Sequence, residues 1–303
     1  MFAQRLLAVL VLLCAPFAEA RESLVFLFQK QQDPAQLRDS AERLGSALTR
    51  QLGRPVEVRV PLDYSASVQA LVSGQADVAY LSALPFLLAR RDGDAQLLLA
   101  EQRLDATGRP LTDYDSVFVV RRDSPLNSFD DLQRDARQLR LAFTSPTSTS
   151  GYIFPYRRLI DSGLLARRAD PRSVFRQISF AGSYTQALRE VLAGRAEVAA
   201  VSDYTVEGPR ADIYLPAADR AQLRVLARTP GVPTHLVAVR KGLDAGTRAA
   251  IRSALLQLSS EQPQMLADVY GASRFVAVDE RRHVAAAVRA IDETGLPIEG
   301  LAR

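Results

Sequence analysis

A run of hydroxyl side chains is the part of this sequence best suited to chemistry. Ser148, Thr149 and Ser150 follow one another between a strand-like stretch, Leu139–Phe143, and a helical pattern that ends near Gly163. The first turn of a helix leaves backbone N–H groups unpaired and carries a partial positive charge. Hydroxyl donors added there predict a site for a small tetrahedral oxyanion that needs no lysine or arginine. The alternative is that one of these hydroxyls only caps the helix.

The N-terminus has the pattern of a secretory signal peptide. Arg5 is positively charged, Leu6–Leu13 is apolar but too short to span a bilayer, and Ala18-Glu19-Ala20 is a small-x-small cleavage signal. We therefore expect residues 1–20 to be removed and the mature chain to be periplasmic. Cys14 raises the question of lipidation, but a leucine precedes it where a small residue would be expected, which favours ordinary cleavage.

The composition excludes several classes of protein. Cleavage removes the single cysteine, so neither a disulfide framework nor a zinc–thiolate site is expected. The net charge is +4, and the basic residues are scattered among acidic ones, which argues against a nucleic-acid-binding stripe. The absence of tryptophan also argues against a platform for stacking bases. We expect no metal and no cofactor.

Strand and helix patterns alternate along the chain. Leu24–Phe28 is an apolar strand, and Val56–Val60 alternates with the period of two that is typical of a strand. Between them, apolar residues recur at helical spacing before Gly53, which is placed to end the helix: Leu37, Ala41, Leu44, Leu48 and Leu52. The alternation predicts an α/β protein with a mostly parallel sheet, and roughly 280 mature residues predict two lobes.

A weak internal repeat supports two lobes. Val68–Ala79 matches Gln186–Ala199, and each copy reads as a helix, a glycine cap and a buried strand. The first strand ends in Tyr80-Leu81-Ser82 and the second in Ser202-Asp203-Tyr204. Ligands of open α/β sheets bind beyond the carboxyl ends of strands, so two such edges facing each other would form a cleft. The alternative is that helix–glycine–strand units recur in any α/β protein.

The segment Pro146–Pro155, which contains the hydroxyl run, is the most specific landmark of the chain. Weaker landmarks occur in a fixed order and spacing around it: Asp63-Tyr64, Ala76–Tyr80, Ser116–Val120, Asp123–Asn127, Phe180–Ser183, and Val239–Lys241 after Pro233. With these landmarks, nearly the whole mature chain resembles the periplasmic phosphonate-, phosphite- and phosphate-binding proteins of ABC importers. The resemblance implies a type II periplasmic-binding-protein fold, with two α/β lobes joined by two crossover strands.

The same resemblance implies lobe boundaries. Lobe 1 is expected to comprise residues 21–116 and 227–303, and lobe 2 residues 117–226, with crossovers at Asp115–Arg122 and Leu223–Ala227. The helical patterns from Gly246 onward are expected to return to lobe 1.

The resemblance also implies ligand-binding residues. Ser148, Thr149 and Ser150 would bind phosphonyl oxygens, and Tyr64 would donate a hydroxyl from lobe 1. Tyr114 stands close to another aromatic residue of the cleft, near the first crossover. Ser183 occupies the place where many relatives have a histidine that contacts the oxyanion, and this departure puts phosphonate specificity in doubt. The alternative for Tyr64 is a half-buried packing residue.

The resemblance places three further residues near the part of the ligand that is not bonded to the phosphonyl oxygens. Tyr204 and His235 fall where aminoalkylphosphonate binders carry acids that hold a substrate ammonium. Neither is acidic, so a zwitterionic aminophosphonate is expected to bind poorly. Asp203 could orient a hydroxyl or accept a proton from a monoprotonated ligand. The alternatives are a turn or cap role for Asp203 and a strand start for His235.

We do not expect an enzyme. A nucleophile needs a base within hydrogen-bonding reach, and only Ser150 with His235 could supply such a pair. A Gly-x-Ser-x-Gly elbow and a metal cluster of histidine and aspartate are both missing from the sequence. We expect a monomeric solute-binding protein that captures a small phosphate-like or phosphonate-like oxyanion for an ABC permease by hinge closure. The alternative is the ligand-sensing periplasmic module of a membrane sensor kinase.

Overall fold

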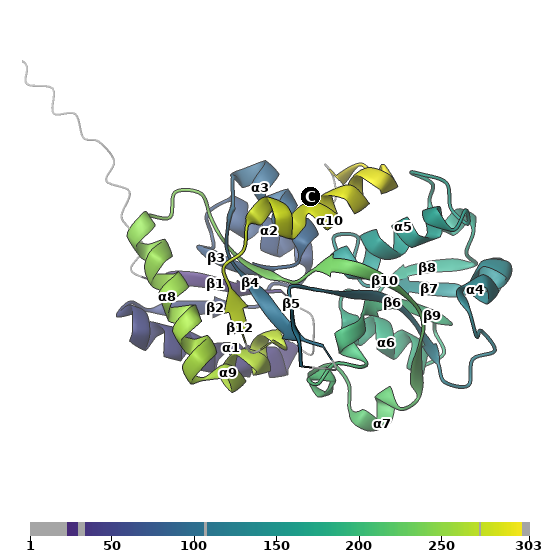
Figure 1. The fold of residues 1–303 in the computed structure, drawn as a ribbon, viewed down its shortest axis with the longest axis horizontal. Coiled ribbons are helices and arrows are strands. Elements are labelled where there is room, and N and C mark those ends of the chain that lie inside the picture. The colour runs from purple at the N-terminus through teal and green to yellow at the C-terminus, as the bar shows by residue number, and fades with distance from the viewer. Residues whose placement is uncertain (1–22, 30–33, 106–107, 273, 299–303) are drawn as a thin grey trace, which may run out of the picture.

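The computed structural model describes residues 23–29, 34–105, 108–272 and 274–298, so the predicted signal peptide lies outside the described residues. Figure 1 shows two α/β bodies side by side, each built around its own sheet. We call the body around the larger sheet lobe 1 and the other lobe 2. Within the described ranges, no helix is both long and apolar enough to cross a membrane.

Lobe 1 is built on a seven-stranded sheet with the order β12-β4-β11-β3-β1-β2, and β5 pairs with β4. Its strands are β1 (Leu24–Phe28), β2 (Val56–Arg59), β3 (Val78–Leu81), β4 (Gln96–Leu104), β5 (Pro110–Leu111), β11 (Leu236–Val239) and β12 (Arg274–Val276). Its helices are α1 (Pro34–Leu52), α2 (Tyr64–Val72), α3 (Ala83–Gly93), α8 (Ala245–Glu261) and α9 (Pro263–Tyr270).

Lobe 2 is built on a five-stranded sheet with the order β10-β6-β9-β7-β8. Its strands are β6 (Asp113–Arg121), β7 (Arg140–Phe143), β8 (Gln177–Phe180), β9 (Val198–Ser202) and β10 (Leu223–Pro233). Its helices are α4 (Phe129–Asp135), α5 (Phe154–Asp161), α6 (Tyr184–Leu192) and α7 (Ala217–Arg220). A π-helical turn, Thr149–Ile153, leads directly into α5.

Both sheets are mixed, which corrects the expectation of a mostly parallel sheet. β1 pairs in parallel with β2 and β3, and β7 with β8 and β9. β11 runs antiparallel to β3 and β4, and β6 runs antiparallel to β9 and β10. β5 and β12 also run antiparallel to β4. The chain enters lobe 2 on β6 and returns to lobe 1 on β11, so neither of these strands follows a crossover helix within its own sheet.

The passages between the lobes run through β6 and β10. β10 pairs with β6 from Leu223 opposite Arg121 to Pro233 opposite Asp113, and the chain then enters β11 of lobe 1. These two strands therefore form a long antiparallel ribbon at the junction, visible near the centre of Figure 1. The residue positions of the lobe boundaries stay a prediction.

The last helix, α10 (Glu280–Thr294), does not sit on lobe 1 alone. α8 and α9 pack on α1, but α10 packs against α5 and β10 as well as α3. Glu293 forms an ion pair with Arg157 of lobe 2 at 2.8 Å, and Glu280 forms one with Arg90 of α3. Figure 1 shows α10 lying across both bodies, so the expected return of every C-terminal helix to lobe 1 holds for α8 and α9 only.

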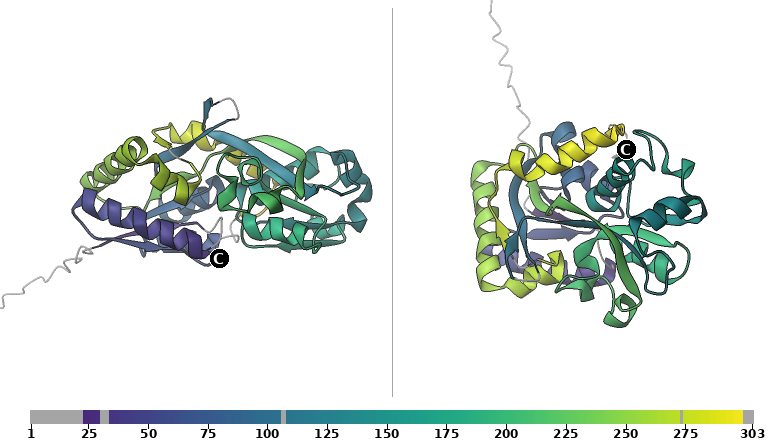
Figure 2. Two further views of the ribbon diagram at one scale, coloured as in Figure 1. Left: turned by 90° about the horizontal axis from the view of Figure 1, so that it is seen from below. Right: turned by 45° about the vertical axis from the view of Figure 1, so that its right-hand side comes forward.

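Buried apolar faces position these elements. The helical face predicted for α1 is buried, because Leu37, Ala41, Leu44 and Leu48 are each at most 2% exposed. Burying one such leucine contributes about 1.5–3 kcal/mol. In the two repeat copies, Gly74 and Gly194 end α2 and α6 with φ of 71° and 66°, a backbone conformation that favours glycine. The views in Figure 2 show the helices lying on the outside of both sheets.

Candidate ligand-binding site

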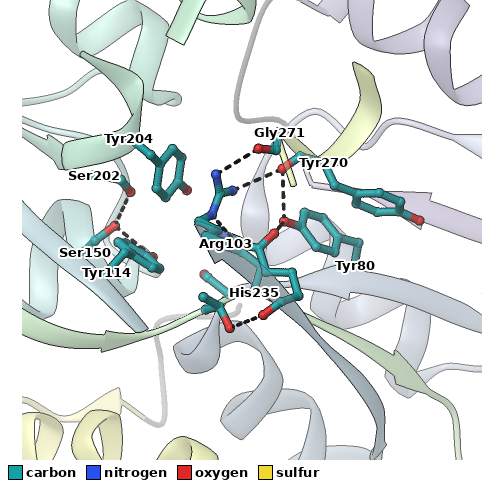
Figure 3. A network of polar contacts seen from close by, with 12 residues as sticks. Tyr80, Arg103, Tyr114, Ser150, Ser202, Tyr204, His235, Tyr270 and Gly271 are labelled. Carbon is teal, nitrogen blue, oxygen red and sulfur yellow. Dashed lines mark hydrogen bonds and ion pairs between the residues drawn. The ribbon is translucent and has the colours of Figure 1, made fainter. Parts of the chain in front are cut away.

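Three buried hydroxyls surround Ser150 and form with it a cluster of four, which we call the hydroxyl cluster; Figure 3 labels Ser150, Tyr114 and Ser202. The Ser150 Oγ lies 2.8 Å from Ser202 Oγ and 2.9 Å from the Tyr184 hydroxyl, and Tyr114 donates to it at 3.3 Å. A serine hydroxyl donates once and accepts twice, so these three contacts fill its capacity. All four groups can rotate their hydrogen atoms, and the cluster can therefore turn its donors toward an incoming acceptor.

The hydroxyl run itself is held at the start of the π-helical turn. Ser148 caps the turn, because its Oγ accepts from Gly151 N at 3.0 Å. A side chain at Gly151 would place a Cβ 2.2 Å from Thr144 Oγ1, so only glycine lets the run wind this tightly after β7. Thr149 Oγ1 accepts from Leu84 N at 2.8 Å, which joins the turn to the first turn of α3 in lobe 1.

Lobe 1 contributes buried polar atoms that lack a partner. Within the described part of the chain, the Tyr64 hydroxyl, Ser82 Oγ and Gln29 Nε2 make no hydrogen bond. Gln29 Oε1 accepts from Ser82 N at 2.9 Å, so the Gln29 side chain lies against the backbone of Ser82 at the start of α3. Burial raises the pKa of Tyr64 well above 10, and the phenols of Tyr184 and Tyr114 add to the rise. Tyr64 therefore keeps its proton and remains a donor.

The internal repeat relates the two walls of the site. Tyr64 opens α2 and Tyr184 opens α6, each directly after a capping residue. Ser82 directly follows β3 and Ser202 is the last residue of β9, and the same number of residues separates Tyr64 from Ser82 as Tyr184 from Ser202. Extending the repeat toward its N-terminal side would therefore have found Tyr184, which sequence reasoning missed.

Ser183 caps α6 and does not join the hydroxyl cluster, and a contact of its hydroxyl with a ligand stays a prediction. Its Oγ accepts from Gln186 N at 3.2 Å and caps α6, as Asp63 caps α2. Tyr184, one residue later, provides the hydroxyl that reaches Ser150. The physical reason is that the residue before the first helical turn points its side chain back at the helix N–H groups.

A second cluster, which we call the ion-pair cluster, consists of Glu101, Arg103, Tyr80 and His235 in lobe 1 (Figure 3). Arg103 Nε donates to Glu101 Oε1 at 2.6 Å, and the other two guanidinium nitrogens donate to backbone carbonyls at 3.1 Å, those of Tyr270 and Gly271. Tyr80 donates to the second oxygen of Glu101. The Glu101 side chain is fully buried.

The charges of this cluster are fixed. Burial alone would raise the pKa of Glu101, but Arg103, His235 and Tyr80 together lower it to about 2. Burial also opposes the charge on Arg103, yet Glu101 holds its pKa above the ordinary value. Burial lowers the pKa of His235, and Glu101 only partly offsets this. The cluster therefore holds one negative and one positive charge beside a neutral imidazole.

The other predicted residues lie around these two clusters. His235 is buried, with its ring stacked on Tyr80 and Tyr114 at centroid distances of 5.2 and 6.0 Å. Its Nδ1 lies 3.6 Å from Glu101 Oε1, and neither ring nitrogen makes a hydrogen bond among the described residues. The Tyr204 ring meets Tyr114 edge-on at 5.0 Å.

Asp203 lies beside the hydroxyl cluster. Its Oδ1 accepts from Tyr204 N at 2.7 Å, which is a local backbone contact. Burial raises the pKa of Asp203 to about 6, and the charge of Asp115 adds to the rise. In the part of the chain that the structure describes, no group of three or more histidine, cysteine, aspartate or glutamate side chains is placed to hold a metal ion.

The family model for the periplasmic phosphonate substrate-binding proteins of ABC transporters matches residues 26–283. This chain belongs to that family. Its members are periplasmic binding proteins of ABC transporters, a class that is not enzymatic. A probable ABC transporter phosphite-binding protein of Prochlorococcus marinus is 22% identical over 262 residues, covering 82% of this chain and 84% of that protein.

Two solved structures support the fold. A binding-protein component of an ABC phosphonate transporter from Pseudomonas aeruginosa has a TM-score of 0.78 at 21% identity, over 89% of this chain and 86% of that one. A Prochlorococcus marinus protein in complex with methylphosphonate has a TM-score of 0.76 at 20% identity, over 90% and 99% of the two chains. The phosphonate-binding family member described here therefore has the predicted type II periplasmic-binding-protein fold, with two α/β lobes joined by crossover strands.

Proposed function

We propose that this protein captures a compact tetrahedral oxyanion of the phosphate, phosphite or methylphosphonate class between its lobes and delivers it to an ABC permease as a monomer. The observation that carries the proposal is the set of buried hydrogen-bond donors that lack an acceptor on lobe 1, opposite the hydroxyl cluster of lobe 2. Leaving one such group unpaired in the interior costs about 1–3 kcal/mol, which a bound acceptor would recover.

An oxyanion suits this set of groups because it only accepts hydrogen bonds. The hydroxyls of Ser150, Tyr184 and Ser202 now satisfy one another, and each can rotate to donate to an anion instead. The partial positive charge at the start of α5 adds a favourable field without a formal cation. Phosphate, phosphite and methylphosphonate share the tetrahedral arrangement of oxygens that such a ring of donors would match.

Binding is coupled to closure of the lobes in this proposal. A ligand held by Tyr64 and Ser82 on one side and by Ser150 on the other would bridge the lobes and favour the closed form. The contact of Thr149 with Leu84 N would add to that preference. The closed shape is what the permease would recognise. The family assignment favours this transport role over the sensor-kinase module that was the sequence-based alternative.

Calorimetric titration of the mature protein with phosphate, phosphite, methylphosphonate and sulfate tests the proposal. We expect at least one of the three phosphorus oxyanions to bind at a single site and to raise the Tm, since a ligand at 100 times its Kd adds about 2.7 kcal/mol of stability. The Ser150→Ala variant should lose most of this affinity, and the Ser183→Ala variant should keep it. If none of the three phosphorus oxyanions bound, the result would contradict the proposal.

A further inference from the structure

The ion-pair cluster touches the lobe that carries the hydroxyl cluster. The Arg103 guanidinium carbon lies 3.5 Å from the centroid of the Tyr204 ring, so a cation of lobe 1 is stacked on an aromatic residue of lobe 2. Figure 3 shows Arg103 between Tyr204 on one side and Tyr270 on the other. Three contacts hold the guanidinium in this position: Glu101 Oε1, Tyr270 O and Gly271 O.

Tyr204 separates Arg103 from the hydroxyl cluster. Its ring meets Tyr114, whose hydroxyl reaches Ser150, and it follows Ser202 by two residues. A ligand whose oxygens face Ser150 must direct any other substituent on phosphorus away from the helix start. If the substituent points toward Tyr114, it meets the Tyr204 ring. The Arg103 guanidinium is stacked on that ring.

The acids near this position are already occupied. Glu101 gives one oxygen to Arg103 and the other to Tyr80. Asp203 gives Oδ1 to the backbone N–H of Tyr204. An ammonium group brought here would lose its hydration, Glu101 already accepts at both of its oxygens, and Arg103 would repel the ammonium. Because the Glu101 carboxylate is paired with Arg103, it does not pair with a cationic group on a ligand.

We propose that Arg103 determines specificity, by occupying Glu101 and stacking on Tyr204 so that the cleft admits compact oxyanions and excludes those with a cationic tail. Arg103 is a positioning residue in this role, because it acts through Tyr204 and Glu101. The inference rests on the proposed capture of a phosphorus oxyanion, and it names the residue pair that selects among such ligands.

Removing the charge of Arg103 or of Glu101 should shift the ligand preference in opposite directions, which tests this inference. Methylphosphonate, 2-aminoethylphosphonate and phosphonoacetate are titrated by calorimetry into the mature wild type and into Arg103→Met, Arg103→Lys and Glu101→Gln variants. The Arg103→Met variant leaves Glu101 free for the ammonium, and its preference for 2-aminoethylphosphonate over methylphosphonate should rise about tenfold or more, the size of one charge-assisted hydrogen bond. The Arg103→Lys variant should keep the wild-type ratio.

The Glu101→Gln variant keeps the cation and removes the anion. Its preference for phosphonoacetate over methylphosphonate should therefore rise by a similar factor. The single amide oxygen of this variant can take the place of one of the two Glu101 oxygens, the one that accepts from Tyr80 or the one that accepts from Arg103. A loosened fold would change affinity for all three ligands alike, so unchanged ratios in a folded Arg103→Met protein would overturn the inference. If that protein does not fold, an unchanged ratio in Glu101→Gln overturns it.

The wild-type titration separates the two proposals. Methylphosphonate binding by the wild type, with ratios that do not move in either variant, would leave the proposed function standing and reject the role of Arg103. A wild type that binds none of the phosphorus oxyanions would reject the proposed function and the specificity role together.

Discussion

The two walls of the site use different chemistry. On lobe 2, neutral hydroxyls around Ser150 satisfy one another and can all rotate. On lobe 1, the Tyr64 and Ser82 hydroxyls lack partners within the described ranges, and the same lobe holds Glu101 and Arg103 as a buried ion pair. In the proposed function, the rotatable hydroxyls of lobe 2 donate to the oxyanion, and the fixed charges of lobe 1 select which groups may be attached to it.

The largest expected effect comes from the centre of the lobe 2 wall. The Ser150→Ala variant removes the group that joins Tyr114, Tyr184 and Ser202, and it removes one donor to the anion. We expect an affinity loss of about 10- to 150-fold, which corresponds to about 1.5–3 kcal/mol for a hydrogen bond to a charged group. Calorimetric titration with methylphosphonate and phosphate measures it, and an unchanged Kd would reduce the cluster to a structural network.

The Tyr64 hydroxyl should contribute nothing to stability in the absence of ligand, unlike a tyrosine hydroxyl that has a hydrogen-bond partner. The Tyr64→Phe variant removes a buried polar atom without a partner, so the free energy of unfolding without ligand should stay level or rise by up to about 1 kcal/mol. The matched control is Tyr156→Phe, whose hydroxyl donates to Ala169 O at 2.6 Å. That variant should lose about 1 kcal/mol of stability. Urea unfolding of both variants separates them, and equal destabilisation would mean that Tyr64 already has a partner.

The buried imidazole near the ion pair predicts a pH dependence. The pKa of His235 is lowered below its ordinary 6.5, so the unfolded chain binds more protons and stability is lost as the pH falls through 6.5 toward the folded pKa. The unfolding free energy of the His235→Gln variant should therefore fall less than that of the wild type between about pH 7.5 and 5.5. His283, whose pKa is lowered chiefly by burial, and Asp203, whose raised pKa acts with the opposite sign, are present in both proteins, so the difference between the two curves reports the removal of His235. If the unfolding free energies of the two proteins changed with pH in parallel, His235 would not be a neutral, buried imidazole in the folded protein.

The smallest effect is expected at the helix cap. The Ser183→Ala variant should lose about 1 kcal/mol of stability and leave the anion affinity unchanged, because its Oγ accepts from Gln186 N and does not join the hydroxyl cluster. Thermal unfolding and titration of the same sample measure both quantities. If this variant lost anion affinity and kept its stability, Ser183 would contact the oxyanion, as the sequence predicted.

Much of this architecture could be predicted from local patterns. Apolar spacing located α1, the hydroxyl run located the helix start after β7, and the resemblance supplied the type II fold. The missed groups depend on contacts between distant elements. Glu101 and Arg103 lie in a strand whose sequence resembles a solvated edge, and only the fold brings Tyr80 and Tyr204 against them. The hydroxyl that reaches Ser150 belongs to Tyr184, one residue after the Ser183 cap, because a cap and the first helical residue cannot be told apart by composition.

One titration tests the central claim, that donors from both lobes hold the same oxyanion. Tyr64 and Tyr184 occupy equivalent places in the two repeat copies, so the Tyr64→Phe and Tyr184→Phe variants remove one matched hydroxyl from each wall. With methylphosphonate or phosphate, each variant should lose affinity by about tenfold or more, since each removes a hydrogen bond to a charged group. Wild-type affinity in either variant would show that the lobe it belongs to does not hold the anion, and would contradict the account.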